Sequence, residues 1–368
     1  MNRVCIARLF IFVILFSSCS KKEIKHEPRP IPVEIGEVII KTVPYYISTV
    51  GHIEAFTIVN IKAQATGYLM NTYFQEGDDL KKGDLMYLID QRPYIAALDL
   101  AEAILEENKA NLGLAERTAA RNTLLAKDDY VSKQVYDQYV TTVQADQAII
   151  KENQASVDTA KINLGFTEIR APIDARAGEW LVNNGNFILE AAETTLVTLN
   201  QITPIYATFF ITGKDFPKVQ RYQKKNGVLK TIITREDPES PPFEGMLTFT
   251  DNQIDLSTGL LRAKSTIPNE DKALWPNEYV HVDLILDMLE NATLVPSSAM
   301  QESPIGKFVY VVKKDNTVEM RKVIAGQKHN DLILIKKGVN PGEKIVTSGQ
   351  INLYQGALVE SKKKEKEA

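Results

Sequence analysis

The stretch "IKAQATGYLMNTYFQEGDDL", residues 61–80, recurs in altered form as "IRAPIDARAGEWLVNNGNFI", residues 169–188. Every residue of the first copy lies 108 positions before its counterpart, and the matching pairs are Ile61 and Ile169, Lys62 and Arg170, Ala63 and Ala171, Gly77 and Gly185, and Leu80 and Ile188. Both copies alternate apolar and polar residues and then reach a glycine, which is typical of a strand followed by a tight turn. Two such β-halves, far apart in sequence, predict one small sandwich assembled from both.

The residues between the two copies predict a pair of long helices. There is no proline from 94 to 171, and good helix formers dominate. Apolar or small residues recur every seven positions on each arm: Leu98, Leu105, Leu112, Ala119 and Ala126, then Tyr136, Val143, Ile150, Val157 and Leu164. A strict period of seven keeps the contact seam on one side of each helix. We therefore expect an antiparallel hairpin with arms of about 45 Å. Its turn falls near 127–131, and Ser132 is expected to cap the second helix.

The N-terminus reads as a targeting segment. Arg3 and Arg8 precede the apolar run "LFIFVILF", residues 9–16, which at eight residues is too short to span a bilayer. The following "FSSC" resembles a bacterial lipobox, in which the cysteine thiol, here Cys19, receives a diacylglycerol and becomes the first residue. We expect residues 1–18 to be a lipoprotein signal peptide and 19–32 a lipidated tether. A plain signal peptide with an incidental cysteine is the alternative.

The C-terminal half is rich in predicted strands. Apolar or alternating runs at 205–211, 229–234, 243–250, 260–267 and 279–287 suit a small antiparallel barrel. A short helix near 213–225 is expected to plug it, with Phe216 and Val219 facing inward. The last region, from residue 294 on, is expected to pair with the N-terminal strands within 32–55, so that one β domain contains both ends of the chain.

Composition and motifs argue against several classes of function. The net charge is −4, and no basic stripe points to nucleic acid. The four histidines are isolated, and the sequence carries no phosphate loop, G-x-S-x-G or CxxC motif. Asp78 and Asp79 are expected to solvate the turn at Gly77. We therefore predict a protein that is not an enzyme and has no cofactor and no metal site, and the dispersed methionines disfavour heavy-metal export.

The two β-halves resemble the biotinyl/lipoyl module. In carrier domains of that kind, the turn between the halves presents a modifiable lysine. Here residues 93–165 replace that turn, so the hypothesis of an acyl carrier loses its reactive residue.

Two further features carry a wider resemblance. Arg121, Leu125 and Ser132 have the spacing R-x3-L-x6-S at the predicted hairpin reversal, and "TGLLRAKSTIPNEDKALWPNEYVHVDLIL" occupies residues 258–286. With the split repeat, the chain resembles the periplasmic adaptors, or membrane fusion proteins, of tripartite RND efflux pumps over nearly its whole mature length. The family commonly has glycine where Asn277 stands, and asparagine tolerates the left-handed turn better than most residues.

The resemblance implies an elongated, multidomain and mainly β fold with a long α-helical hairpin. Its expected parts are a membrane-proximal β domain (33–55 and 289–360), a split lipoyl-like domain (56–92 and 166–200), the hairpin (93–165) and a β-barrel domain (201–288). It also implies that the hairpin tip engages an outer-membrane channel of TolC type. Arg121 would then bind carbonyls or carboxylates, Leu125 would make an apolar contact, and Ser132 would offer a hydroxyl. The alternative is a solvated arginine, a seam leucine and a helix cap.

The implied partners follow from the same resemblance. They are an inner-membrane RND transporter, the outer-membrane channel, further copies of this chain in a ring, for which family precedent suggests six, and the inner membrane itself, reached in the periplasm through the lipid on Cys19. Two alternatives remain at this point. The chain could be the adaptor of an ABC-type exporter, or a structural envelope lipoprotein with no role in transport.

Overall fold

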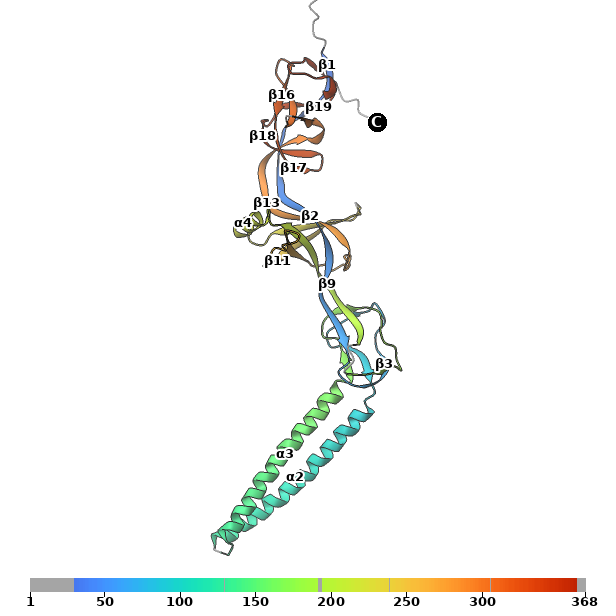
Figure 1. Ribbon diagram of the computed structural model, residues 1–368, viewed down its shortest axis with the longest axis vertical. Coiled ribbons are helices and arrows are strands. Elements are labelled where there is room, and N and C mark those ends of the chain that lie inside the picture. The colour runs from blue at the N-terminus through green and yellow to red at the C-terminus, as the bar shows by residue number, and fades with distance from the viewer. Residues whose placement is uncertain (1–29, 129, 191–193, 238, 305, 363–368) are drawn as a thin grey trace, which may run out of the picture. The chain divides into compact units, whose positions relative to one another are not determined.

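The computed structural model describes residues 30–128, 130–190, 194–237, 239–304 and 306–362 (Figure 1). The chain divides into two compact units. Unit 1 combines the residues up to Tyr45 with those from Asp287 onward, and unit 2 runs from Tyr46 to Leu286. Within the described ranges, no helix has the length and apolar character needed to cross a membrane. The predicted signal peptide and Cys19 lie outside the described residues.

The first part of unit 2 is the predicted sandwich, built from both halves of the repeat. Its strands are β3 (Gly67–Thr72), β4 (Asp79–Leu80), β5 (Leu85–Ile89), β6 (Glu168–Arg170), β7 (Ala175–Ala177) and β8 (Phe187–Ile188). One continuous core joins them: Leu69, Met86 and Ile89 of the first half pack with Ile169, Ala177 and Ile188 of the second. The prediction of a single sandwich from two distant segments is confirmed.

The two halves exchange equivalent bonds. The Gly77 amide donates to the Ala177 carbonyl at 3.1 Å, and the Gly185 amide donates to the Leu69 carbonyl at 2.7 Å. The two bonds are the same interaction with the halves interchanged, because Gly185 and Ala177 lie 108 positions after Gly77 and Leu69. Both glycines have a left-handed backbone, with φ of +84° and +87°, which residues with a Cβ rarely adopt. The repeat therefore folds as two interlocked copies.

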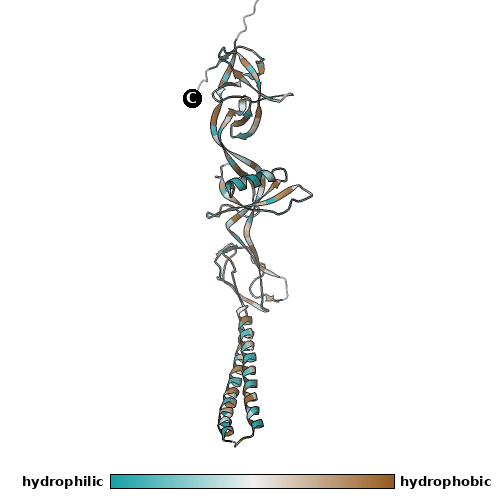
Figure 2. Cartoon of the chain, turned by 90° about the vertical axis from the view of Figure 1, so that its left-hand side faces the viewer, coloured by the Kyte–Doolittle hydropathy of each residue, from teal (hydrophilic) through white to brown (hydrophobic). Residues whose placement is uncertain are grey.

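The insertion forms the predicted hairpin, from α2 (Arg92–Lys127) and α3 (Lys133–Gly165). Every position of the two seven-residue series is buried or half-buried, which confirms the seam. Among the described residues of these helices only Leu105 and Val157 are fully buried. Figure 2 shows hydrophilic and hydrophobic residues mixed along both helices, without a continuous apolar band. The helix pair is therefore held by a thin seam.

The hairpin is joined to the sandwich at its base by side-chain hydrogen bonds. The Tyr94 hydroxyl donates to the Thr66 carbonyl and accepts from the Thr66 amide, both at 3.0 Å. Asp90 accepts from the Arg92 amide at 3.1 Å at the start of α2, and the Arg92 guanidinium lowers the pKa of Asp90 to about 2. These bonds fix where α2 leaves the sandwich.

Unit 2 continues into the predicted barrel. Its elements are β9 (Thr195–Thr212), α4 (Phe216–Asn226), β10 (Lys230–Arg235), β11 (Phe243–Thr250), β12 (Leu260–Ile267), β13 (Tyr279–Pro296) and β2 (Ile39–Lys62). Neighbouring strands follow the order β13, β10, β11, β12, β9 and β2, and β2 also pairs with β13, which closes the barrel. Val219 of α4 is buried and Phe216 is half-buried, as expected for a helix that covers the barrel end.

Closure of the barrel depends on the turn at Asn277. Its φ is +70°, and its amide donates to the Ile53 carbonyl at 2.7 Å, while the Ile53 amide donates to the Glu278 carbonyl at 2.8 Å. The expectation that asparagine keeps the left-handed turn is confirmed. The sequence did not indicate that β9 is one 18-residue strand, which pairs with β7 of the sandwich and with β12 of the barrel.

The expectation that Asp79 solvates the turn at Gly77 is wrong, because its carboxylate forms ion pairs instead. Asp79 accepts from the Lys272 ammonium at 2.5 Å and lies 3.4 Å from the Arg176 guanidinium, which also lies over the Trp275 ring. These contacts join the sandwich to the loop between β12 and β13 of the barrel. Asp78, in contrast, accepts from the Gln75 amide and closes the turn. The Lys272 hydrogen bond lowers the pKa of Asp79.

We expect Asp79→Asn to loosen the loop between β12 and β13. A carboxylate with a lowered pKa contributes stability above its unfolded pKa of about 3.9, and that stability is lost as pH falls through the lower folded value. Hydrogen exchange of residues 268–278 at neutral pH should therefore be faster in the variant. In the wild-type chain, the protection of these amides relative to their intrinsic exchange rate should fall only in strong acid. Asp78→Asn is the control, since its amide oxygen still accepts from Gln75. Equal exchange in Asp79→Asn and wild type would contradict this assignment.

Unit 1 contains both ends of the described chain, as predicted. β1 (Ile31–Glu37) pairs antiparallel with β19 (Lys344–Ser348) and parallel with β20 (Val359–Ser361). The remaining elements are η2 (Ser297–Ala299), β14 (Gln301–Ser303), β15 (Gly306–Val312), β16 (Val318–Lys322), β17 (Ile324–His329), β18 (Leu332–Lys337) and η3 (Gln350–Asn352). One small core holds Val33 of β1 against Val346 and Val359.

Candidate functional site

The predicted site residues are placed around the hairpin turn. Arg121 and Leu125 lie in the last two turns of α2, and Ser132 directly precedes α3. All three side chains are exposed. The Tyr130 amide donates to the Leu125 carbonyl at 3.1 Å and so closes the end of α2. The structure thus brings the three residues to one end of the hairpin, away from the sandwich core.

Arg121 offers an available guanidinium. No ion pair or side-chain hydrogen bond joins it to another of the described residues. It lies on α2 six residues before that helix ends at Lys127. Because a guanidinium carries five donors in a planar fork, it can bind a carboxylate or two carbonyls of a partner at once.

Leu125 does not belong to the seam. The seam residues of this part of α2 are Ala119, Asn122 and Ala126, which are half-buried. Leu125 lies one position before Ala126, and its side chain is 41% exposed. The alternative of a seam leucine is therefore wrong, and Leu125 presents an apolar surface at the tip.

Ser132 is the N-cap of α3, as predicted. Its backbone is extended, with φ −69° and ψ 149°, and its Oγ accepts from the Val135 amide at 3.4 Å. A cap of this type stabilises the helix by about 1 kcal/mol. The cap uses the oxygen as acceptor, so the hydroxyl hydrogen can still be donated to a partner.

Sequence reasoning missed two apolar residues at the turn. Leu124 is exposed beside Leu125, and Tyr130, in the connection between the helices, is 79% exposed. Both residues lie outside the seven-residue series. An apolar residue that is near the turn but outside this series has no core to enter, so the sequence could have indicated that both are exposed. We call Arg121, Leu124, Leu125, Tyr130 and Ser132 the tip surface.

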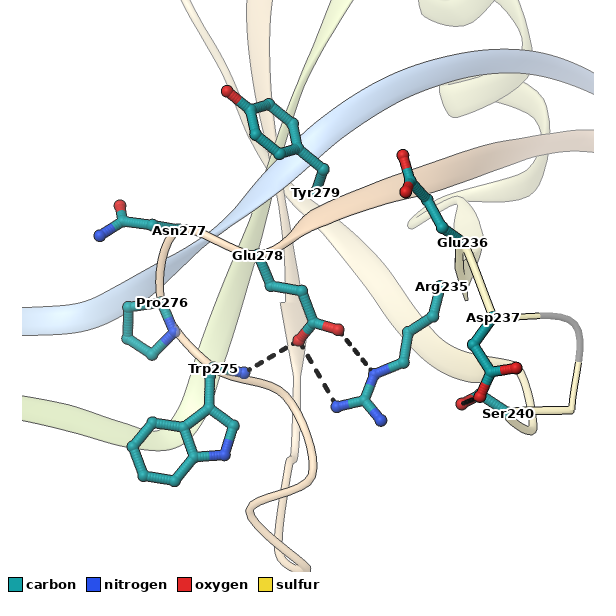
Figure 3. A pocket seen from close by; sticks show the side chains of 9 residues that line it. All are labelled: Arg235, Glu236, Asp237, Ser240, Trp275, Pro276, Asn277, Glu278 and Tyr279. Carbon is teal, nitrogen blue, oxygen red and sulfur yellow. Dashed lines mark hydrogen bonds and ion pairs between the residues drawn. The ribbon is translucent and has the colours of Figure 1, made fainter.

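Elsewhere the described residues offer no constellation suited to catalysis or metal binding. They include no group of three or more His, Cys, Asp or Glu side chains able to hold a metal ion. The hollow in Figure 3 contains Glu278, but Arg235 neutralises it at 2.8 Å and the Trp275 amide donates to it. Asp237 in the same hollow accepts from the Ser240 hydroxyl at 3.0 Å. These carboxylates shape loops and are not set up as an acid–base pair.

Family models match three parts of the chain. They are the alpha-helical hairpin domain of RND MFPs at residues 97–167, the beta-barrel domain at 204–288 and the C-terminal permuted SH3 domain at 291–351. Multidrug resistance protein MdtA of Xenorhabdus bovienii is 32% identical over 340 residues, which cover 92% of this chain and 82% of that protein. MdtA of Escherichia coli O139:H28 is 34% identical over 329 residues, with coverage of 89% and 79%.

Solved structures share the fold. MacA from Actinobacillus actinomycetemcomitans superposes with a TM-score of 0.62 at 21% identity, covering 85% of this chain and 99% of that one. A MacA–MexA chimera with the Pseudomonas aeruginosa MexA hairpin gives a TM-score of 0.54 at 24% identity, covering 86% and 100%. The fold, the hairpin and these relatives define a periplasmic adaptor. The chain belongs to the RND membrane fusion protein family, as the sequence resemblance indicated.

Proposed function

We propose that this chain is the non-enzymatic adaptor of a tripartite RND multidrug efflux pump. In this role it couples an inner-membrane, proton-driven transporter to an outer-membrane channel. The observation that carries the proposal is the tip surface, an exposed arginine and apolar patch at the end of a helix pair with only Leu105 and Val157 fully buried. Such a pair contributes little to the core of its own chain, yet ordering it costs conformational entropy. Contact with a distant partner explains why it is kept.

The tip surface suits the end of another helical hairpin or barrel. Arg121 binds carbonyls or carboxylates there, because its guanidinium can donate two parallel hydrogen bonds. Leu125 and Tyr130 supply apolar contact area, and a tyrosine adds a hydroxyl that can pair at the same time. Ser132 donates a hydroxyl hydrogen. A TolC-type channel is the partner proposed for this surface.

The rest of the proposal concerns the anchor and the assembly. Cys19 carries the lipid in the periplasm at the inner membrane, with 19–32 as tether. Residues 33–55 with 289–360 form the membrane-proximal part, 56–92 with 166–200 the lipoyl-like part, 93–165 the hairpin and 201–288 the barrel. About six copies form a ring around the transport path, with lipoyl-like parts side by side. The relatives named for multidrug resistance support the assignment to a multidrug efflux pump.

Purification of the tagged full chain from detergent-solubilised envelopes tests the proposal. We expect a large, twelve-span permease and an outer-membrane channel to co-purify. A nucleotide-binding exporter subunit in place of the permease would favour the ABC-type alternative. Recovery of neither membrane partner would favour the structural lipoprotein and would contradict the proposal.

Cys19→Ala is expected to move the protein from the membrane fraction to the soluble periplasm, because the acyl chains contribute about 0.8 kcal/mol for each buried CH₂ group. Fractionation and palmitate labelling measure the effect. Ser20→Ala is the matched control, since it changes the next residue and leaves the thiol in place, and it should stay membrane-bound. Palmitate incorporation into the Cys19→Ala chain would contradict the assigned lipidation site.

A further inference from the structure

Unit 1 presents a charge-free loop with two outward apolar residues. The sequence "GQINLYQGALV", residues 349–359, contains no charged residue, in a chain where 24% of residues are charged. Ile351, in η3, is 99% exposed, and Tyr354 is 60% exposed. Isolated exposed apolar residues are common and need no explanation. The case for a contact surface therefore depends on whether the loop has a fixed conformation and on where in unit 1 it lies.

The loop is held in one conformation. Leu353, between the two exposed residues, is buried in the core around Val33, and the Tyr310 hydroxyl donates to the Leu353 carbonyl at 2.9 Å. Gly349 and Gly356, with φ of +90° and +83°, form the turns at either end. Ile351 and Tyr354 therefore stay exposed, because the residue between them is fixed inside.

The loop lies beside the first strand of the described chain. A Cβ at Gly349 would come within 3.0 Å of the Pro32 carbonyl oxygen, and the Lys362 amide donates to the Val33 carbonyl at 2.8 Å. β20 runs parallel to β1 with Ile31 opposite Val359. Figure 1 shows the red C-terminal segment next to the blue start of β1. The exposed pair thus lies at the same end of unit 1 as the junction with the proposed tether.

The tether limits how far this end can lie from the bilayer. Ile31 lies twelve positions after Cys19 in the chain. A fully extended chain spans at most about 3.3–3.6 Å per residue, so Ile31 stays within about 40 Å of the lipid on Cys19. This step rests on the proposed lipidation.

We propose that Ile351, Tyr354 and Lys362 form a contact surface for the periplasmic face of the inner membrane. A branched aliphatic side chain enters the boundary between headgroups and acyl chains, and a tyrosine ring lies at headgroup level with its hydroxyl in water. Lys362, exposed directly after β20, attracts the phosphates of anionic lipids. Residues 349–359 bring no carboxylate to the surface, and the exposed carboxylate nearest to them in sequence is that of Glu360 in β20. The lipid on Cys19 and this loop act as two attachments that orient unit 1.

An environment-sensitive dye attached to the loop tests the proposal. Cys5 leaves with the signal peptide and Cys19 is acylated, so a single introduced cysteine can be labelled alone. The fluorophore NBD is attached at Ile351→Cys in the full acylated chain, in vesicles of phosphatidylethanolamine and phosphatidylglycerol. We expect a blue-shifted emission that doxyl lipids quench and aqueous iodide does not. Ile324→Cys is the matched control, an isoleucine of unit 1 that is 53% exposed on β17, and it should respond to iodide only.

Vesicle binding of the unlipidated chain provides a second measurement. In the Cys19→Ala background, Ile351→Glu should lower the vesicle partition coefficient at least tenfold, which corresponds to about 1.4 kcal/mol, because the apolar side chain no longer enters the bilayer. Ile324→Glu should leave it unchanged. Equal iodide quenching of the dye at positions 351 and 324 would overturn the proposal. The proposal would also be overturned if the dye at position 351 were protected from iodide only when the transporter is present, with or without lipid. Loss of palmitate labelling in the wild-type chain would refute the anchor alone, and the partition measurement would still decide the loop.

Discussion

Arg121→Asp is expected to abolish drug resistance while the amount of protein in the envelope stays the same. The wild-type guanidinium is exposed and makes no ion pair with the described residues, so its loss removes nothing from the fold that the structure shows. A carboxylate in its place repels the partner's carboxylates and carbonyls, to which the arginine would have donated. Minimum inhibitory concentrations in a strain complemented with each variant, with immunoblots of the envelope fraction, measure the effect.

Arg117→Asp is the matched control. Arg117 is exposed on α2 one helical turn before Arg121. The same charge reversal is therefore made on the same helix, at a similarly exposed position further from the tip. Both positions lie more than one turn before α2 ends at Lys127, so the helix dipole should affect the two variants little. Arg121→Lys should keep only part of the resistance, because an ammonium cannot form the two parallel bonds of a guanidinium. Full resistance in Arg121→Asp would refute the assignment of the tip surface.

Leu105→Asp is expected to separate the two hairpin helices. Leu105 and Val157 are the only fully buried side chains among the described residues of α2 and α3, and the Glu102–Lys161 ion pair at 3.4 Å lies beside them. Removal of a buried leucine costs about 2–5 kcal/mol, and an unpaired carboxylate in the seam adds to this loss. Far-ultraviolet circular dichroism should show the helical signal melting at a markedly lower temperature, and resistance should be lost with it.

Leu114→Asp on the same helix supplies the comparison. Leu114 is exposed, so its replacement should leave the melting curve close to that of the wild type. The two tryptophans lie outside the hairpin: Trp180 packs against the sandwich core, and Trp275 lies in the loop between β12 and β13. Tryptophan fluorescence should therefore change little in either variant. Identical melting curves for Leu105→Asp and Leu114→Asp would mean that the seam does not hold the hairpin.

Much of the fold follows from short-range patterns in the sequence. The 108-residue repeat and the seven-residue series predicted the sandwich, the helix pair and the Ser132 cap, because each depends on periodicity or on neighbours within four residues. The continuity of β9 from sandwich to barrel could not be predicted in this way. A strand that changes partners along its length has the same local pattern as two shorter strands.

The link between sandwich and barrel was not predictable for a related reason: Asp79 and Lys272 are 193 positions apart, and no local pattern indicates that they meet. The candidate site itself was only partly predictable. Leu124 and Tyr130 escaped notice because periodicity identifies residues that enter a core, whereas these two contribute to a surface. Arg121, Leu125 and Ser132 were found through a family spacing, and the structure added the exposure of Leu125.

The interlocked bonds of Gly77 and Gly185 bear on how the molecule can evolve. Neither half of the sandwich completes its hydrogen bonding until the other has been synthesised, yet α2 and α3 run side by side and return the chain to where it left. The entropic cost of bringing the two halves of the sandwich together therefore depends little on the length of the helices between them. Equal insertions or deletions of seven residues in both arms preserve the seam and leave the sandwich untouched. The length of the hairpin can thus increase or decrease during evolution while the rest of the protein stays unchanged.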